Sequence, residues 1–231
     1  MMSAAPAVVR ITWPKAWRLI RSIYPPIDLF EDIADPADWE ALASAEAKTN
    51  PRVWEHLGRL DLVPPARRVS GPGSSYLMAP FVHVSHDRPG RFTDGSYGVL
   101  SLGDSEEVCI REIAHHHAKV MAATSEAPGW TSQFRMLVTS LDRDLHDIRP
   151  IADCHDPGDY SAPQALARQL RSAGSNGVVY HSVRCPGGQC AGLFWPDLVP
   201  APVQADHYDF HWNGTRVDRI RNCATQAIFA L

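Results

Sequence analysis

The sequence lacks an excess of positive charge, a long apolar run and a disulfide-type spacing of cysteines. Its 22 Lys and Arg are outnumbered by 26 Asp and Glu, which gives a formal net charge of −4. The chain as a whole therefore lacks the excess positive charge that is typical of nucleic-acid-binding proteins. Its apolar runs are far shorter than a membrane span, and no signal peptide is expected because residues 1–17 contain no continuous apolar core. The five cysteines are an odd number, which favours a reducing compartment. We therefore expect a cytoplasmic protein.

The composition that remains is that of an ordinary globular protein. Of the 231 residues, 45% are apolar and 21% are charged, and this length is sufficient for one domain with a hydrophobic core. Strand and helix patterns follow one another without the regular alternation of a parallel sheet, which predicts an α+β fold. We expect a single domain over residues 1–231, with its core at about 15–217. A loose leader is expected before this core, and a short helix or coil after it.

Apolar spacing predicts where the elements lie. Helical spacing predicts helices at 35–49, 51–60, 104–121 and 163–173. Alternating or continuous apolar runs predict strands at 17–23, 76–84, 97–102, 133–141, 178–183 and 193–195, and one or two more within 203–216.

One stretch, residues 90–119, concentrates the candidate functional side chains. It opens with a turn that carries Arg91, continues in a short apolar run and enters a helix at the acidic segment 104–107. Ser or Asp at such a point caps free N–H groups, and an acidic first turn suits the positive end of the helix dipole. Glu112 and His116 are four residues apart and therefore share a face of that helix. An arginine on a turn and a carboxylate on the next helix are typical of a pocket for an anion and a sugar.

The same stretch resembles the core of the RES domain, a family named for an arginine, a glutamate and a serine. The Gly-Arg-Phe turn at Arg91 is similar to the family's GRW or GRF, and Glu112 and His116 match its glutamate and the histidine one helical turn later. The serine is identified as Ser182, in a segment similar to the family's G-[IV]-x-Y-x-S-x-R. Further similar segments extend the likeness over roughly residues 15–217, and they lie at 17–26, 46–52 and 191–194.

One position departs from the family pattern. The family usually has a tyrosine ten residues after its arginine, where this chain has Ser101. Tyr97 lies four residues earlier in the same expected strand, so it would point to the same face but about 13 Å along it. Tyr97 and Ser101 are both candidates for substrate binding, although neither simply replaces the family tyrosine. The departure leaves room for weaker stacking on the substrate, an altered rate or a different acceptor.

The resemblance implies NAD as substrate, no metal, and a fold similar to ADP-ribosyltransferases with a mixed, mostly antiparallel sheet and flanking helices. It implies cleavage of the nicotinamide–ribose bond through a transition state that resembles an oxocarbenium ion. Arg91 would bind phosphate or ribose with its fork of donors, and Glu112 would stabilise the sugar cation, as carboxylates do in glycoside chemistry. Ser182 would position the substrate. His116 would orient Glu112 or the acceptor, because its pKa range suits proton transfer.

Partners and further contacts follow from the same resemblance. Arg18 and Arg52 lie in two of the similar segments, where each could bind phosphate or serve as a structural salt-bridge partner. The family implies a toxin of a toxin–antitoxin pair, with an Xre-like antitoxin that occludes the pocket in a bacterial cytoplasm. It also allows a homodimer. Water, phosphate and a protein side chain are the three acceptors that remain open.

Each candidate also has an ordinary structural interpretation. A turn arginine is commonly a solvated surface group, Glu112 could simply pair with a helix neighbour, and a serine in a buried strand usually bonds to backbone. The histidines at 115–117 do not form a metal site by themselves, because consecutive helical residues point about 100° apart. Cys185 and Cys190 lack a second pair of ligands.

Two other classes of function are also considered. The first is a non-catalytic family member that binds only a nucleotide or a partner protein. Loss of turnover with retained binding in Glu112→Gln would instead support an enzyme. The second is a nuclease toxin that uses arginine and histidine. The acidic net charge argues against the nuclease, and strong retention on heparin with a steep salt dependence would favour it.

Overall fold

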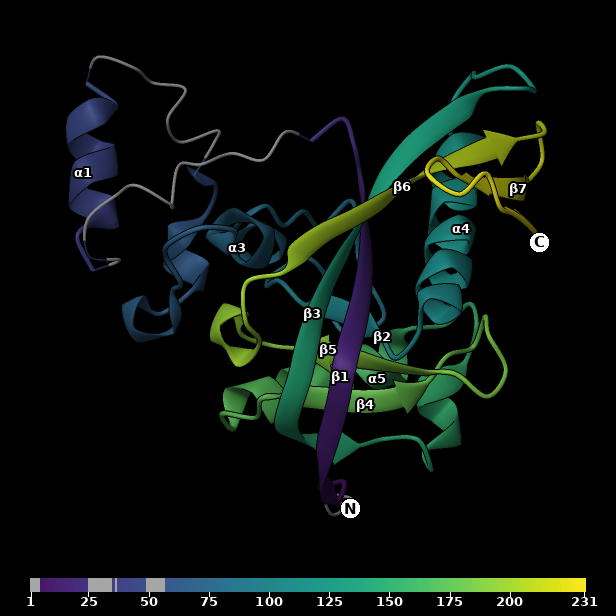
Figure 1. The fold of residues 1–231 in the computed structure, drawn as a ribbon. Helices are drawn as coiled ribbons and strands as arrows, with labels where there is room; N and C mark the ends of the chain where they lie inside the picture. Colours follow the sequence, from purple (N-terminus) through teal and green to yellow (C-terminus); the bar gives the residue numbers. More distant parts are fainter. Residues whose placement is uncertain (1–4, 25–34, 36, 49–56) are drawn as a thin grey trace.

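The computed structural model describes residues 5–24, 35, 37–48 and 57–231. Within these residues the fold is α+β and contains an eight-stranded sheet (Figure 1). The strands are β1 (Val8–Arg21), β2 (Leu100–Gly103), β3 (Thr131–Asp147), β4 (Gly177–His181), β5 (Gln189–Leu193), β6 (Val203–Trp212), β7 (Val217–Asn222) and β8 (Ile228–Ala230). The helices are α1 (Trp39–Glu46), α3 (Ser74–Val82), α4 (Glu106–Ala122) and α5 (Ser161–Ser172). The predicted fold class is confirmed.

The strands run in the order β1-β2-β5-β4-β3-β6-β7-β8, and β1 also pairs with β3. The first five strands of this order therefore form a closed ring, because β3 at its end also pairs with β1 at its start. Strands β6, β7 and β8 extend the sheet from β3. Among the described strands only β3 and β4 pair in parallel, as at His146 and Val178. The expected mixed, mostly antiparallel sheet is confirmed.

Strand β1 corrects the prediction of a loose leader. It begins at Val8 and pairs antiparallel with β3, from Val8 opposite His146 to Arg21 opposite Phe134. The strand contains Pro14, and proline cannot donate to a ladder. The pairing shifts register between Trp13 and Ala16, so the proline lies in a local irregularity that tolerates it.

Helix α3 corrects the prediction of a strand at 76–84. Leu77, Met78 and Phe81 are buried, so the segment carries no polar face from which helical periodicity could be recognised. Pro80 lies inside the helix, where its missing N–H removes one backbone hydrogen bond. The expected helix at 51–60 lies mostly outside the described residues.

The C-terminal end corrects the prediction of a short helix or coil. A turn around Gly214 joins β6 to β7, and β8 then pairs with β7. The turn before β8 is held by Asn222, whose side-chain oxygen accepts from the backbone N–H of Ala224 at 2.8 Å and of Thr225 at 3.0 Å. The tail is therefore an edge strand.

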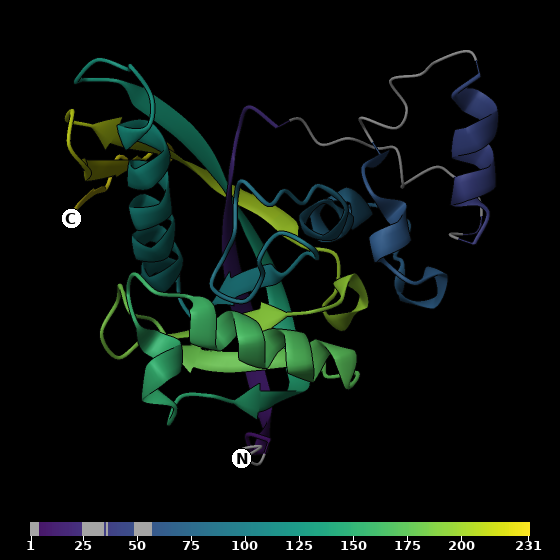
Figure 2. The same cartoon turned by 180° about the vertical axis from the view of Figure 1, so that it is seen from behind.

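Two helices cover different parts of the sheet. In Figure 1 helix α4 runs beside β6 and β7, and it buries Ile110, Ala114 and Met121. Helix α5 lies across β4 (Figure 2), where Ala167 and Leu170 join a second part of the core. No helix in the described part of the chain is long and apolar enough to cross a membrane.

Candidate functional site

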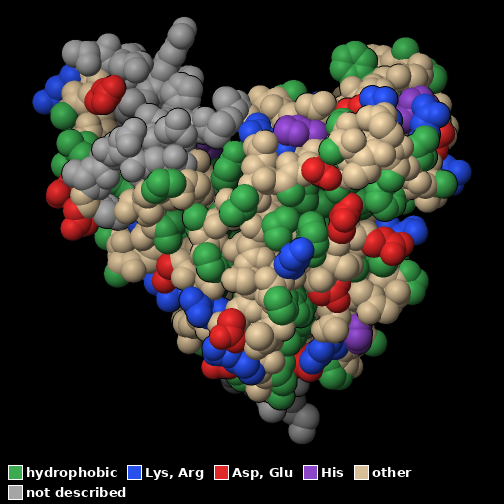
Figure 3. All heavy atoms as spheres, viewed as in Figure 1, with side chains coloured by type: hydrophobic (Ala, Val, Ile, Leu, Met, Phe, Trp, Pro, Cys, Tyr) green, Lys and Arg blue, Asp and Glu red, His purple; other side chains and the backbone are tan. Residues whose placement is uncertain are grey.

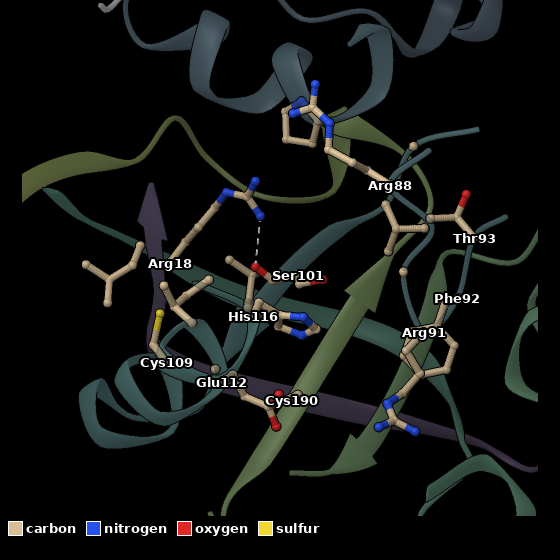
Figure 4. Close-up of a pocket in the computed structure, with 18 of the residues that line it drawn as sticks. Arg18, Arg88, Arg91, Phe92, Thr93, Ser101, Cys109, Glu112, His116 and Cys190 are labelled. Atoms are coloured by element: carbon tan, nitrogen blue, oxygen red, sulfur yellow. Dashed lines mark hydrogen bonds between the residues drawn. The ribbon is translucent and has the colours of Figure 1, made fainter. Parts of the chain in front are cut away.

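A cavity of about 360 Å³ opens where β1, β2 and α4 meet the loop 83–99 (Figure 4). This volume is in the range of small-molecule sites. The cavity brings together six of the residues predicted from the sequence, which are Arg18, Arg91, Tyr97, Ser101, Glu112 and His116. Ser182 contacts one of these residues from behind the lining. Arg52 lies outside the described residues.

Glycines allow the loop of the cavity to pass close to α3 and to the segment that follows it. A Cβ at Gly98 would lie 2.2 Å from the carbonyl oxygen of Pro80 and 2.3 Å from Cα of Phe81. Gly95 has a φ of +88°, and a Cβ there would lie 2.3 Å from the carbonyl oxygen of Ser85. A side chain at Gly98 would push the cavity wall away from α3, and one at Gly95 would push it away from Ser85. The Gly-Ser-Tyr-Gly segment is thus required by backbone approach as well as by the motif.

Helix α4 supplies the carboxylate and one histidine of the site. Its first turn is capped by Ser105, whose hydroxyl accepts from the backbone N–H of Val108 at 3.3 Å. The residues on the other side of the helix pack on the sheet, which turns Glu112 and His116 together toward the cavity. The four-residue spacing that was expected to place them on one helical face therefore brings both side chains into the cavity lining.

Ser182 holds the carboxylate of Glu112. Its hydroxyl donates to Oε1 of Glu112 at 2.5 Å and accepts from the backbone N–H of Arg184 at 3.2 Å and of Cys185 at 3.0 Å. A hydroxyl has one donor and two acceptor sites, so all three are occupied and the rotamer is fixed. Ser182 is 7% exposed and does not line the cavity. The geometry favours a serine that positions Glu112 over one that touches substrate.

We expect Ser182→Ala to lower kcat for the reaction at this site by about tenfold, the equivalent of one lost hydrogen bond to a charged group. KM should change less, because no atom of Ser182 faces the cavity. Steady-state kinetics on the variant and on Ser105→Ala, which loses only a helix cap, separate the two effects. An increase in KM at constant kcat would show that Ser182 binds substrate directly.

Arg91 lies at the edge of the cavity and is held by backbone and an aromatic ring. Its Nη1 donates to the carbonyl oxygens of Cys154 and Asp156, each at 2.9 Å. Its guanidinium carbon lies 4.6 Å from the centroid of the Tyr160 ring. No carboxylate among the described residues forms an ion pair with it. Its charge therefore remains available to an anion in the cavity.

Arg18 enters the cavity from β1. Its Nη1 donates to the carbonyl oxygen of Ser101 at 3.2 Å (Figure 4), and its Nε is buried without a hydrogen-bond partner in the described structure. Burial lowers the pKa of Arg18. The structural salt bridge considered for Arg18 is therefore not formed with any described carboxylate. A cation so placed is suited to an anionic ligand.

Tyr97 and Ser101 occupy different surroundings. Strand β2 begins at Leu100, so the expectation that Tyr97 shares a strand face with Ser101 is wrong. The Tyr97 hydroxyl donates to the carbonyl oxygen of Phe92 at 2.6 Å, and burial raises the pKa of Tyr97 to about 12. Tyr97 thus forms a neutral, fixed part of the wall. Ser101 is exposed in the cavity and leaves open the space that a larger side chain would fill.

The three consecutive histidines of α4 face different surroundings. Desolvation lowers the pKa of His116 and the Glu112 carboxylate partly offsets this, so the His116 ring is neutral at pH 7. His117 is buried with its ring 4.9 Å from that of Phe134, and burial lowers its pKa to about 4. Desolvation also lowers the pKa of His115 to about 4. In the described residues no three His, Cys, Asp or Glu side chains are grouped to hold a metal ion.

Several lining residues were missed by sequence reasoning. Arg88 and His83 come from the loop after α3, and Cys109 and Cys190 from α4 and β5. Arg88 lies just before the turn that carries Arg91, and no role was predicted for it. The two cysteines are buried apolar-type positions whose spacing carries no signal. These four residues could be identified as lining residues only once the loop after α3 was known to face α4.

The surface shows no concentrated positive patch on the face drawn in Figure 3. Blue and red side chains are interspersed there. This distribution agrees with the formal net charge of −4 and does not provide the positive stripe that a nuclease would use on a phosphate backbone.

The chain is similar to several known proteins. The family model described as RES domain matches residues 65–213, a range that includes Arg91, Glu112, His116 and Ser182. The uncharacterized protein y4oC of Sinorhizobium fredii (strain NBRC 101917 / NGR234) is 30% identical over 209 residues, which cover 87% of this chain and 84% of that protein. A chain in the crystal structure of the M. tuberculosis MbcT–MbcA toxin–antitoxin complex is similar over 86% of both chains, with 11% identity and a TM-score of 0.44.

Proposed function

The chain belongs to the RES domain family, and we propose that it is the toxin of a toxin–antitoxin pair that cleaves the nicotinamide–ribose bond of NAD. The observation that carries this proposal is the Glu112 carboxylate, which Ser182 fixes beside a cavity whose other charged lining residues are arginines. A ribose that develops positive charge next to a pyrophosphate calls for this combination of one carboxylate and several cations.

The residues divide the work of bond cleavage between them. Nicotinamide leaves with the electron pair of its bond to C1′ of the ribose, and the positive charge left on the ribose is stabilised by Glu112. Arg91 and Arg18, which have no carboxylate partner among the described residues, bind the pyrophosphate oxygens. Ser182 keeps Glu112 in place. The neutral ring of His116 accepts the proton that a water, phosphate or protein side-chain acceptor releases when it attacks C1′.

The proposal extends to setting and partner. An antitoxin of the Xre-like type would cover the cavity in a bacterial cytoplasm and keep NAD out. A toxin with the antitoxin bound over its cavity would stay folded but inactive, since the cavity is already formed in the free chain.

The proposed function is tested by following nicotinamide release from NAD by the purified chain, with and without added phosphate. We expect release in both conditions if water is the acceptor, and release that rises with phosphate if phosphate is the acceptor. ADP-ribosylation of a protein target in a lysate, followed with labelled NAD, identifies the third acceptor. Binding of NAD with no release and no labelled product would instead establish a non-catalytic nucleotide-binding protein.

A further inference from the structure

A third arginine lines the cavity and is not used by the proposed cleavage. Arg88 lies in the loop that follows α3, and it is exposed at the rim. In Figure 4 it lies on the opposite side of the pocket from Glu112, with Ser101 and His116 between them. A substrate whose ribose reacts at Glu112 would therefore extend its far end toward Arg88.

The guanidinium of Arg88 has no partner in the described part of the chain. Its backbone N–H donates to the carbonyl oxygen of Ser85, but its side chain makes no hydrogen bond or ion pair there. The acidic residues of the same loop are engaged elsewhere. Asp87 accepts from the hydroxyl of Ser85 at 3.4 Å, and Asp94 pairs with Arg168 at 2.7 Å. Arg88 therefore forms no ion pair with either of these acids, and its guanidinium is available to an anion at the rim of the cavity.

The cavity also lacks the group that selects a free ribose hydroxyl. Proteins that discriminate NAD from its 2′-phosphorylated form place a carboxylate on the adenosine ribose, whereas an arginine accommodates the 2′-phosphate. Among the described residues that line this cavity, Glu112 is the single acid, and it lies at the reacting end. At the far end the charged lining residue is Arg88.

We propose that this chain accepts the 2′-phosphorylated dinucleotide NADP at least as well as NAD, and that Arg88 binds the 2′-phosphate. The inference rests on the proposed cleavage, since it takes the reacting ribose to lie at Glu112. Arg18 and Arg91 then hold the pyrophosphate shared by both dinucleotides. Arg88 supplies a charge-assisted contact that only the additional phosphate can make.

The test compares kcat/KM for nicotinamide release from NADP and from NAD. For the wild-type chain we expect a ratio of one or more. Arg88→Ala should lower the ratio about tenfold, the usual effect of one lost hydrogen bond to a charged group, and Arg88→Glu should lower it further by repulsion. Arg216→Ala, an exposed arginine in the turn between β6 and β7 and outside the cavity lining, should leave the ratio unchanged.

A second measurement keeps this inference separate from the proposed cleavage. Titration calorimetry with ADP-ribose and with its 2′-phosphate needs no turnover, and we expect the 2′-phosphate to bind at least as tightly and to lose its advantage in Arg88→Ala. This result, with neither nicotinamide release nor a labelled product in a lysate, would retain the assignment of Arg88 and reject the cleavage. A wild-type preference for NAD above tenfold, or equal losses toward both ligands in Arg88→Ala, would reject the assignment of Arg88.

Discussion

Glu112→Gln is expected to lower kcat for nicotinamide release by about 10²- to 10³-fold, which is typical for loss of one electrostatic contact to a charged transition state. The amide has nearly the same shape as the carboxylate, and its oxygen still accepts the hydroxyl of Ser182. The fold and the position of the side chain should therefore be retained. What is lost is the negative charge beside the ribose, so KM for the dinucleotide should change far less than kcat.

The matched control for this change is Glu107→Gln on the same helix. Glu107 is exposed and pairs with Arg111 at 2.9 Å, and a surface pair of this kind contributes about 0.5 kcal/mol or less. Its replacement should leave kcat within about twofold, as expected for a side chain outside the cavity. Equal activity of Glu112→Gln and wild type would remove the carboxylate from the mechanism.

The local part of this site could be predicted from the sequence because its signals are local. Ser105 and the acidic turn after it mark the start of α4, and helical spacing places Glu112 and His116 on one face. The contact of Ser182 with Glu112 spans 70 residues. It forms because β4 lies between β3 and β5 in the sheet, and no spacing along the chain encodes that order.

The sequence was least informative where burial removes periodicity. Helix α3 is buried on several sides, so its apolar run was interpreted as a strand. The predicted strand was shorter than β1 because the residues before it were interpreted as a loose leader, and its partner β3 lies more than a hundred residues away. Arg88 was missed for a related reason. A charged residue in a turn has no pattern of its own, and its role depends on what the turn faces.

Arg18→Met is expected to have opposite effects on stability and on binding. The Nε of Arg18 is buried without a partner in the described structure, and its guanidinium has no described carboxylate within ion-pair distance. Burial of an uncompensated charge is unfavourable, so its removal should raise the free energy of unfolding by about 1 kcal/mol. The same change removes a charged contact to the pyrophosphate, so the Kd for the dinucleotide should rise about 30-fold, the equivalent of about 2 kcal/mol.

Arg68→Met is the matched control, because Arg68 is a buried arginine whose contacts are satisfied within the chain. Its Nη2 donates to Glu40 at 2.6 Å and to the carbonyl oxygen of Leu60 at 3.1 Å, and its Nε donates to the carbonyl oxygen of Val63 at 3.0 Å. Its replacement should lower the free energy of unfolding by about 3 kcal/mol and leave the Kd of correctly folded protein unchanged. Urea denaturation and titration calorimetry on both variants measure the two quantities. If Arg18→Met destabilised the chain as Arg68→Met does, Arg18 would be a structural residue, because a side chain kept for ligand binding reduces stability until its ligand arrives.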